Sequence, residues 1–218
     1  MNNNDSLLKQ IIAIIAVIFI AYVMYYGTYL PYAKSTAFIQ FLENQNNIHS
    51  LGEYLQAAAV PLDINSPVGQ EELVKNTGSN IISIIQNIQD ATITTDLVNF
   101  IGRYYKPILR HPDGLNFAQN LLIWGTINEY AGFATKNPTE IETALQAFIE
   151  GLQLSPDRPQ FLYSLFQMYQ ALRENSQAIL VGKEILKNWP NDTQTAKALA
   201  QLESATTSLE ITTSSSEK

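Results

Sequence analysis

The sequence contains no cysteine and only two histidines. Without cysteine there are no disulfides, no thiol nucleophiles and no thiolate metal sites. His49 and His111 lie far apart in polar turns, which favours solvated loop residues over a metal site or a catalytic base. The sequence also lacks a glycine loop of the kind that cradles phosphate. We therefore expect no cofactor, no bound metal and no catalytic residue.

Charged residues are scarce as well, at 15% of the chain, against about 25% in average soluble proteins. Acidic residues outnumber basic ones by 20 to 13, which gives a net charge of −7. A nucleic-acid partner is not expected, because phosphate recognition requires a basic face. The carboxylate pairs Glu71-Glu72 and Glu140/Glu142 fall at predicted helix starts, where the helix macrodipole favours negative charge.

Hydrophobic residues make up 46% of the 218-residue chain, enough for the core of one domain with appendages. The most apolar block spans residues 7–30, preceded by a short tail at 1–6, and its interior from Ile11 to Met24 carries no charge. A helix over the block measures roughly 36 Å, enough to cross a hydrocarbon core of about 30 Å. We predict a transmembrane helix over 7–30 that contacts membrane lipid. Gly27 and Pro31 are expected to end it.

Tyrosines gather at the C-terminal end of this block, as they do at water–lipid boundaries: Tyr22, Tyr25, Tyr26, Tyr29 and Tyr32. A cleaved signal peptide is the alternative, but the start is Asn-rich with only Lys9, and the apolar run is too long. A retained single-pass anchor is favoured. Lys9 and Lys34 flank the two ends of the block, so charge leaves the orientation open.

Residues 31–112 are predicted to form a membrane-proximal helical region. Apolar residues recur at helical spacing over 73–88 and 97–108, which predicts two helices packed as an antiparallel hairpin. Thr94-Thr95-Asp96 is expected to cap the second of them. A strand interpretation is rejected because the apolar pattern does not alternate with period two. Arg110 to Gly114 is expected to form a turn.

Residues 113–204 contain two patterns that echo each other, Ala144…Phe148…Leu152…Pro156 and Ala178…Gly182…Leu186…Pro190. Their spacing is the tetratricopeptide period of about 34 residues, in which each repeat is a pair of antiparallel helices. The sequence therefore predicts an all-α protein with TPR-like hairpins.

Four repeat helices are expected near 116–135, 139–154, from 159 to the turn at Glu174-Asn175, and from there to 189. A capping helix over 193–204 and a disordered Ser/Thr-rich tail over 205–218 should follow. In the second hairpin Phe166 stands where the repeat pattern has glycine.

Aromatic side chains of the repeats are candidates for a ligand groove, although at helical spacing such residues are more often core: Trp124, Tyr130, Phe161, Tyr163, Phe166 and Tyr169. The predicted partner-binding residues are Tyr130, Tyr163, Phe166 and Gln167. The paired basic and amide residues that clamp a peptide carboxylate in some repeat proteins are not evident.

The order of segments resembles a known family. The apolar helix ending in Tyr29-Leu30-Pro31 is followed by 66–74 (SPVGQEELV), 120–125 (NLLIWG) and 158–163 (RPQFLY). Over most of residues 20–192 this resembles the C-terminal portion of O-antigen ligase or polymerase-like membrane proteins with tetratricopeptide repeats. The resemblance implies a bacterial cell-envelope protein with an extracytoplasmic repeat domain. The multi-helix membrane core that performs glycan transfer is missing from this chain, and no catalytic residue can be carried over.

These observations lead to one hypothesis and two alternatives. The hypothesis is a membrane-anchored, non-catalytic scaffold whose repeat face binds a protein or peptide, or positions cell-surface glycan machinery. The first alternative is a fragment or subunit of an O-antigen ligase-like glycosyltransferase in surface polysaccharide assembly. The second is a small-molecule carrier that uses the aromatic groove.

Overall fold

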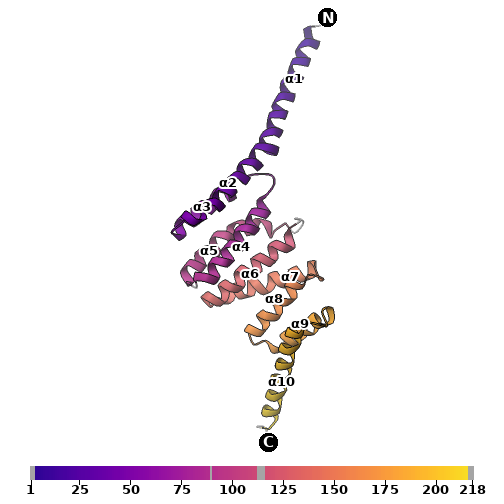
Figure 1. Ribbon diagram of the computed structural model, residues 1–218. Helices are drawn as coiled ribbons and strands as arrows, with labels where there is room; N and C mark the ends of the chain where they lie inside the picture. Colours follow the sequence, from indigo (N-terminus) through magenta and orange to yellow (C-terminus); the bar gives the residue numbers. More distant parts are fainter. Residues whose placement is uncertain (1–2, 89, 112–115, 216–218) are drawn as a thin grey trace.

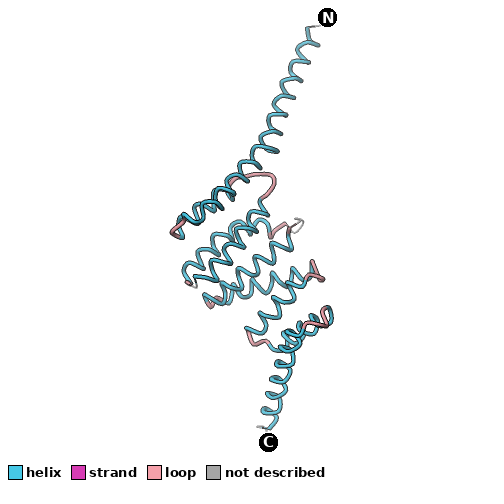
Figure 2. The backbone as a smooth tube through the Cα atoms, in the orientation of Figure 1, coloured by secondary structure: helices cyan, strands magenta, loops and turns pink. Residues whose placement is uncertain are grey.

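The computed structural model describes residues 3–88, 90–111 and 116–215, with side chains for 7–88, 90–111 and 116–205. Every regular element in these ranges is helical, which confirms the all-α prediction (Figures 1 and 2). The α-helices are α1 (Asn3–Met24), α2 (Leu30–Asn44), α3 (Leu51–Asp63), α4 (Gln70–Ile88), α5 (Ala91–Ile108), α6 (Phe117–Thr135), α7 (Pro138–Leu154), α8 (Pro159–Ala171), α9 (Asn175–Asn188) and α10 (Thr193–Ser215).

The N-terminal helix is longer than the sequence predicted. A π-helical turn, Tyr25–Tyr29, joins α1 to α2, so the helix continues past Gly27 and Pro31 instead of ending there. In a regular α-helix the Pro31 ring would clash with the carbonyl four residues earlier. The wider turn, in which the Leu30 N–H bonds to the Tyr25 carbonyl five residues back, accommodates the proline.

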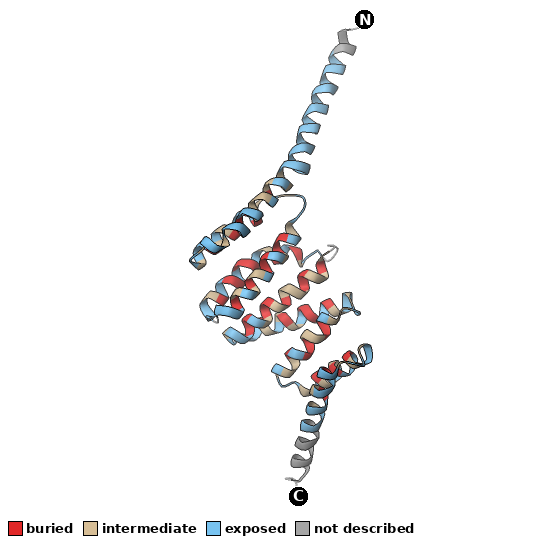
Figure 3. Cartoon of the chain, in the orientation of Figure 1, coloured by how far each residue is buried: buried red, intermediate tan, exposed pale blue. Residues whose placement is uncertain are grey.

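One stretch of the described residues, Leu7–Asn47, is long and apolar enough to cross a membrane by length and composition. From Leu7 to Met24 the side chains of α1 are exposed all round, and this part of the helix projects from the rest of the molecule in the pale blue of exposed residues (Figure 3). A helix that is apolar on every side and packs against nothing is typical of a lipid-facing span.

The projecting helix is attached to the domain through α2 and α3, which pack side by side (Figure 1). The Phe41 and Tyr54 rings meet edge to face, with centroids 5.7 Å apart. Lys34 is buried at 2% exposure, and its Nζ donates to the Ile64 carbonyl at 2.7 Å and to the Gln70 side-chain oxygen. These contacts tie α2 to the loop after α3 and to the start of α4.

Helices α4, α5 and α6 form the largest core, in which buried residues are concentrated (Figure 3). The apolar stripes over 73–88 and 97–108 face inward as expected. The predicted cap was wrong: Asp90 caps α5, with its carboxylate accepting from the N–H groups of Thr92 and Ile93, and Thr94 is buried inside the helix. Of the predicted turn over 110–114, residues 112–114 lie outside the described residues.

Helices α6 to α9 begin and end within a few residues of the predicted positions, and each packs against the next. Ala144 and Ala178 are both fully buried, as expected for small residues where helices cross closely. Helix α10 packs against α9 and continues to Ser215, into the Ser/Thr-rich tail for which the sequence predicts disorder from residue 205; that disorder stays a prediction. Residues 216–218 of that prediction lie outside the described residues.

Candidate binding groove

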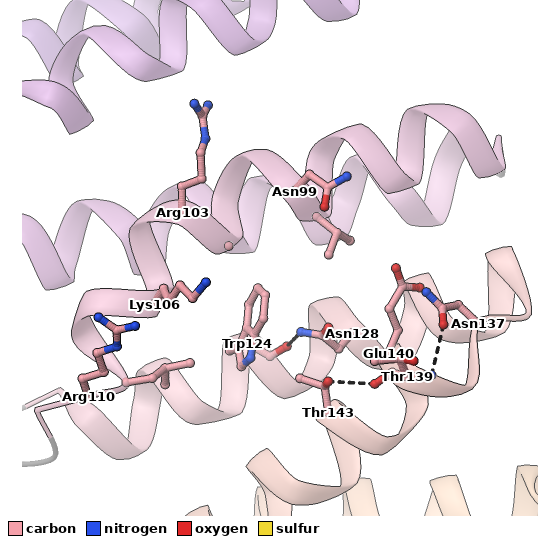
Figure 4. Close-up of a pocket in the computed structure, with 13 residues that line it drawn as sticks. Asn99, Arg103, Lys106, Arg110, Trp124, Asn128, Asn137, Thr139, Glu140 and Thr143 are labelled. Atoms are coloured by element: carbon pink, nitrogen blue, oxygen red, sulfur yellow. Dashed lines mark hydrogen bonds between the residues drawn. The ribbon is translucent and has the colours of Figure 1, made fainter.

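A groove of about 630 Å³ opens between α5 on one side and α6 with the start of α7 on the other (Figure 4). We call it the α5–α7 groove. Its lining residues are Val98, Asn99, Gly102, Arg103, Lys106, Leu109, Arg110, Trp124, Asn128, Asn137, Thr139, Glu140 and Thr143. Most of the lining residues are polar or charged, but most of the surface that they expose to the groove is nonpolar, so the groove is suited to a ligand that has both polar and apolar groups.

The basic side chains come from α5 and from the turn that follows it. Lys106 lies in the last turn of α5 and Arg110 lies two residues beyond the helix, and both are at the same end of the groove (Figure 4). Arg103 belongs to the rim: its guanidinium lies 5.3 Å from the Phe100 ring centroid and 5.8 Å from that of Tyr104, and points away from Trp124. The basic end of the groove is thus formed by two cations, Lys106 and Arg110.

The opposite wall begins with Trp124 and Asn128 on α6. Asn128 is only 2% exposed, and its Nδ2 donates to the Trp124 carbonyl at 2.8 Å. The Trp124 ring lies 5.1 Å from the buried Tyr105 ring, measured between centroids. These contacts hold a flat apolar surface in the middle of the groove, between its two ends (Figure 4).

The far end of the groove is formed by the first turn of α7. Asn137 caps this helix by accepting from the Thr139 N–H at 3.0 Å, and the Thr143 hydroxyl donates to the Thr139 carbonyl at 2.7 Å. Glu140 is 9% exposed and accepts a hydrogen bond from the Thr135 hydroxyl at 2.8 Å. This end carries a fixed carboxylate beside an amide, opposite in charge to the basic end.

The two cations of the groove have no acidic partner within the described part of the chain. The ion pairs found there join Lys75 to Glu72, Lys183 to Glu203 and Lys187 to Glu184, all on other surfaces. Lacking an ion pair does not by itself distinguish Lys106 and Arg110, because the ion pairs among the described residues involve only three of the 13 basic residues; what sets these two apart is that both face one groove. They generate a local positive potential that favours an anionic group on a ligand.

The four predicted partner-binding residues do not lie in this groove, and the structure does not bring them together. Tyr130, on α6, is 38% exposed and lines a separate hollow of about 420 Å³ with Ile85 and Phe133. The other three lie on α8. Gln167 is exposed there.

The two aromatic predictions on α8 contact the protein itself. Phe166 is 5% exposed and packs in the core with Ala178 and Ile185, so it is not available to a partner. Tyr163 is half-buried; its hydroxyl donates to Asp192 at 2.7 Å and its ring packs 5.9 Å from that of Trp189. The hydrogen bond to Asp192 raises the pKa of Tyr163.

Sequence reasoning missed most of the groove. Trp124 was among the aromatic candidates, but Lys106, Arg110, Asn128 and Asn137 were not. The available signal was the basic spacing on α5, with Arg103, Lys106 and Arg110 at intervals of three and four.

Comparison with known proteins gives no further guide: no family model and no curated protein matches the chain. The resemblance to O-antigen ligase or polymerase-like proteins therefore stays a prediction from short motifs. The class that the fold defines is an all-helical chain with one long apolar N-terminal helix and a polar groove between α5 and α7.

Proposed function

We propose that this chain is a membrane-anchored, non-catalytic interaction module whose α5–α7 groove holds a segment of a protein partner. The observation that carries the proposal is the groove itself, with two cations at one end that form no ion pair with any described residue, a carboxylate at the other end and an aromatic floor between. Such a surface recognises a ligand, but it offers neither a nucleophile beside a base nor a pair of carboxylates across a cleft.

The anchor part of the proposal rests on the exposed apolar helix. Isoleucine, valine and phenylalanine face outward over 11–20, where water would impose a large hydrophobic cost. A bilayer removes that cost and places the tyrosines of 22–32 at its surface. Lys34 follows directly and is held by the domain, so the domain would lie close to the bilayer.

The repeat part of the proposal rests on packing. Pro156 and Pro190 each follow the second helix of a hairpin, at the tetratricopeptide spacing of about 34 residues. In the first hairpin Gly132 lies so close to α7 that a Cβ there would be 2.9 Å from the Ile141 backbone nitrogen. We interpret α6–α7 and α8–α9 as two TPR-like units that support the groove at one end of the stack.

Photocrosslinking in the cell's own membranes tests this function. A benzoylphenylalanine at Thr143, inside the groove, is expected to give a discrete protein adduct. The same group at Leu180, which is 63% exposed on α9, is the matched control. The adduct should disappear in the Lys106→Glu/Arg110→Glu variant. No adduct from position 143, or the same adducts from both positions, would overturn the proposal.

A further inference from the structure

The α5–α7 groove has opposite charges at its two ends. Lys106 and Arg110 lie at one end, and Glu140 lies at the other beside Asn137 and Asn99 (Figure 4). Glu140 is fixed by its hydrogen bond from Thr135. A ligand that fills the groove is therefore bound best if it carries an anionic group at one end and N–H donors or a cationic group at the other.

The length of the groove sets the size of the ligand. Asn99 on α5 and Arg110, two residues past the end of that helix, mark its two ends. At about 1.5 Å per residue through the helix and the turn that continues it, they are separated by roughly 16 Å. An extended polypeptide rises about 3.3 Å per residue, so about five residues span the groove. The middle of such a segment would lie over Trp124, where Val98 and Leu109 complete an apolar surface.

From these features we infer that the groove binds an extended segment of about five residues that carries an acidic side chain at one end, an apolar side chain in the middle and a basic side chain at the other. The carboxylate meets Lys106 and Arg110, the apolar group covers Trp124, and the basic group meets Glu140. This inference rests on the proposed function and specifies the partner's chemistry. The amides of Asn99 and Asn137, which solvent reaches, add hydrogen-bonding groups for the peptide backbone.

Other ligand classes match the groove only in part. A phosphate group satisfies the basic end but leaves the Glu140 end and the apolar floor unused. A neutral glycan stacks on Trp124 without needing either charge. A nucleic acid is disfavoured by the net charge of −7. Only a segment with charges of both signs, separated by an apolar residue, uses both ends and the floor.

The test measures binding of blocked five-residue peptides to the full-length protein in zwitterionic lipid nanodiscs. Trp189→Phe leaves Trp124 as the single fluorescence reporter, since the chain has two tryptophans. The probes are Glu-Gly-Leu-Gly-Arg, the reverse order Arg-Gly-Leu-Gly-Glu, and the neutral Gln-Gly-Leu-Gly-Gln. We expect one charged order to bind at least about tenfold more tightly than the neutral peptide, a difference of roughly 1.4 kcal/mol.

Variants assign each charge to its end of the groove. Lys106→Gln/Arg110→Gln should abolish the affinity that the peptide gains from its acidic residue. Glu140→Gln should abolish the affinity that it gains from its basic residue. Lys187→Gln/Lys197→Gln, which removes two charges from exposed sites on α9 and α10, should leave binding unchanged.

Two results would overturn the inference. One is equal binding of the neutral and charged peptides. The other is a change in Trp124 fluorescence on adding inorganic phosphate or anionic vesicles, but none on adding the peptides, where the Lys106→Gln/Arg110→Gln variant abolishes that change. A protein adduct from position 143 together with either result would reject the peptide chemistry while the proposed function stands. Absence of the adduct would reject the function itself.

Discussion

At the scale of single residues, Glu129 on α6 is the most perturbed acid of the described chain outside the groove. Burial raises the pKa of Glu129 to about 7. Because the unfolded chain releases this proton at a lower pH, the folded state binds more protons between about pH 4.5 and 7. The free energy of unfolding should therefore fall as the pH rises through this window.

Glu129→Gln removes this dependence. At pH 8 the variant should be more stable than the parent by roughly 2–3 kcal/mol, because no charge has to be buried. Near pH 4.5 the two proteins should have nearly equal stability. Urea unfolding followed by tryptophan fluorescence, at several pH values in detergent, measures the difference. The control is Glu150→Gln, at an exposed site on α7. Parallel stability curves for parent and Glu129→Gln would contradict the prediction.

Another residue-scale feature is a large and a small residue, Phe166 and Gly182, that have exchanged positions in the second hairpin relative to the first. Phe166 on α8 replaces the glycine expected in a tetratricopeptide pattern, and it fits because Gly182 on α9 leaves room for its ring. A Cβ at Gly182 would lie 2.9 Å from Phe166 Cε2 and 3.3 Å from Leu199 Cδ1. In the other hairpin the large residue, Phe148, occupies the position that corresponds to Gly182.

At the scale of helix pairs, this exchange predicts how α8, α9 and α10 pack. Gly182→Ala should lower the free energy of unfolding by about 1–3 kcal/mol, because it overpacks the point where the three helices meet. Adding Phe166→Leu should restore part of the loss. Gly52→Ala on α3, where a Cβ meets nothing within 4 Å, is the control and should be neutral or mildly stabilising. Equal losses for Gly182→Ala with and without Phe166→Leu would contradict this packing.

Much of the helical layout could be predicted because helix periodicity is a local property. The stripe over 73–88 and the bounds of α6 to α9 follow from spacing and from turn residues such as Pro138 and Pro159. Competing local signals produced the errors. Thr94-Thr95-Asp96 resembles a cap, yet Asp90 is the residue whose carboxylate reaches the free N–H groups.

The long helix and the groove depend on information that a local pattern does not contain. Pro31 usually ends a helix, but a π-helical turn keeps the chain helical through it. The groove exists because α5 packs beside α6 and faces the start of α7, which brings Lys106 near residues more than 20 positions away in sequence. Lys106 and Arg110 on their own look like an ordinary solvated face.

At the scale of the whole molecule, the structure is a series of packed helices that follows the projecting α1, in which α4 packs most extensively against α6 and the helices from α6 to α10 each pack against the next (Figure 1). The junction between anchor and domain is formed by α2 and α3, whose Phe41, Tyr54, Ala58 and Leu62 are buried in one core with residues of α4 and α5. Hydrogen bonds add to it: those of Lys34, one from the Tyr104 hydroxyl to Asp63 at 2.7 Å and one from the Tyr54 hydroxyl to Asn80 at 2.9 Å. Burial lowers the pKa of Lys34, while the nearby Asp63 charge opposes that shift.

This junction predicts that Lys34 controls how firmly the domain is held relative to the anchor. Lys34→Met keeps the apolar stem but leaves the Ile64 carbonyl and the Gln70 side chain without their hydrogen-bond donor, which should lower the free energy of unfolding by about 1–3 kcal/mol.

Spin labels measure how firmly the domain is held. The chain has no cysteine, so thiol-reactive labels attach only to the two cysteines introduced by Tyr32→Cys and Gln146→Cys, both at exposed sites. Pulsed electron resonance should show a narrow distance distribution in the parent and a broad one in Lys34→Met. Ser35→Ala, at the exposed neighbouring site, should stay narrow. If the distribution keeps its width in Lys34→Met, the α2–α3 pair alone orients the domain and the lysine contributes only to local stability.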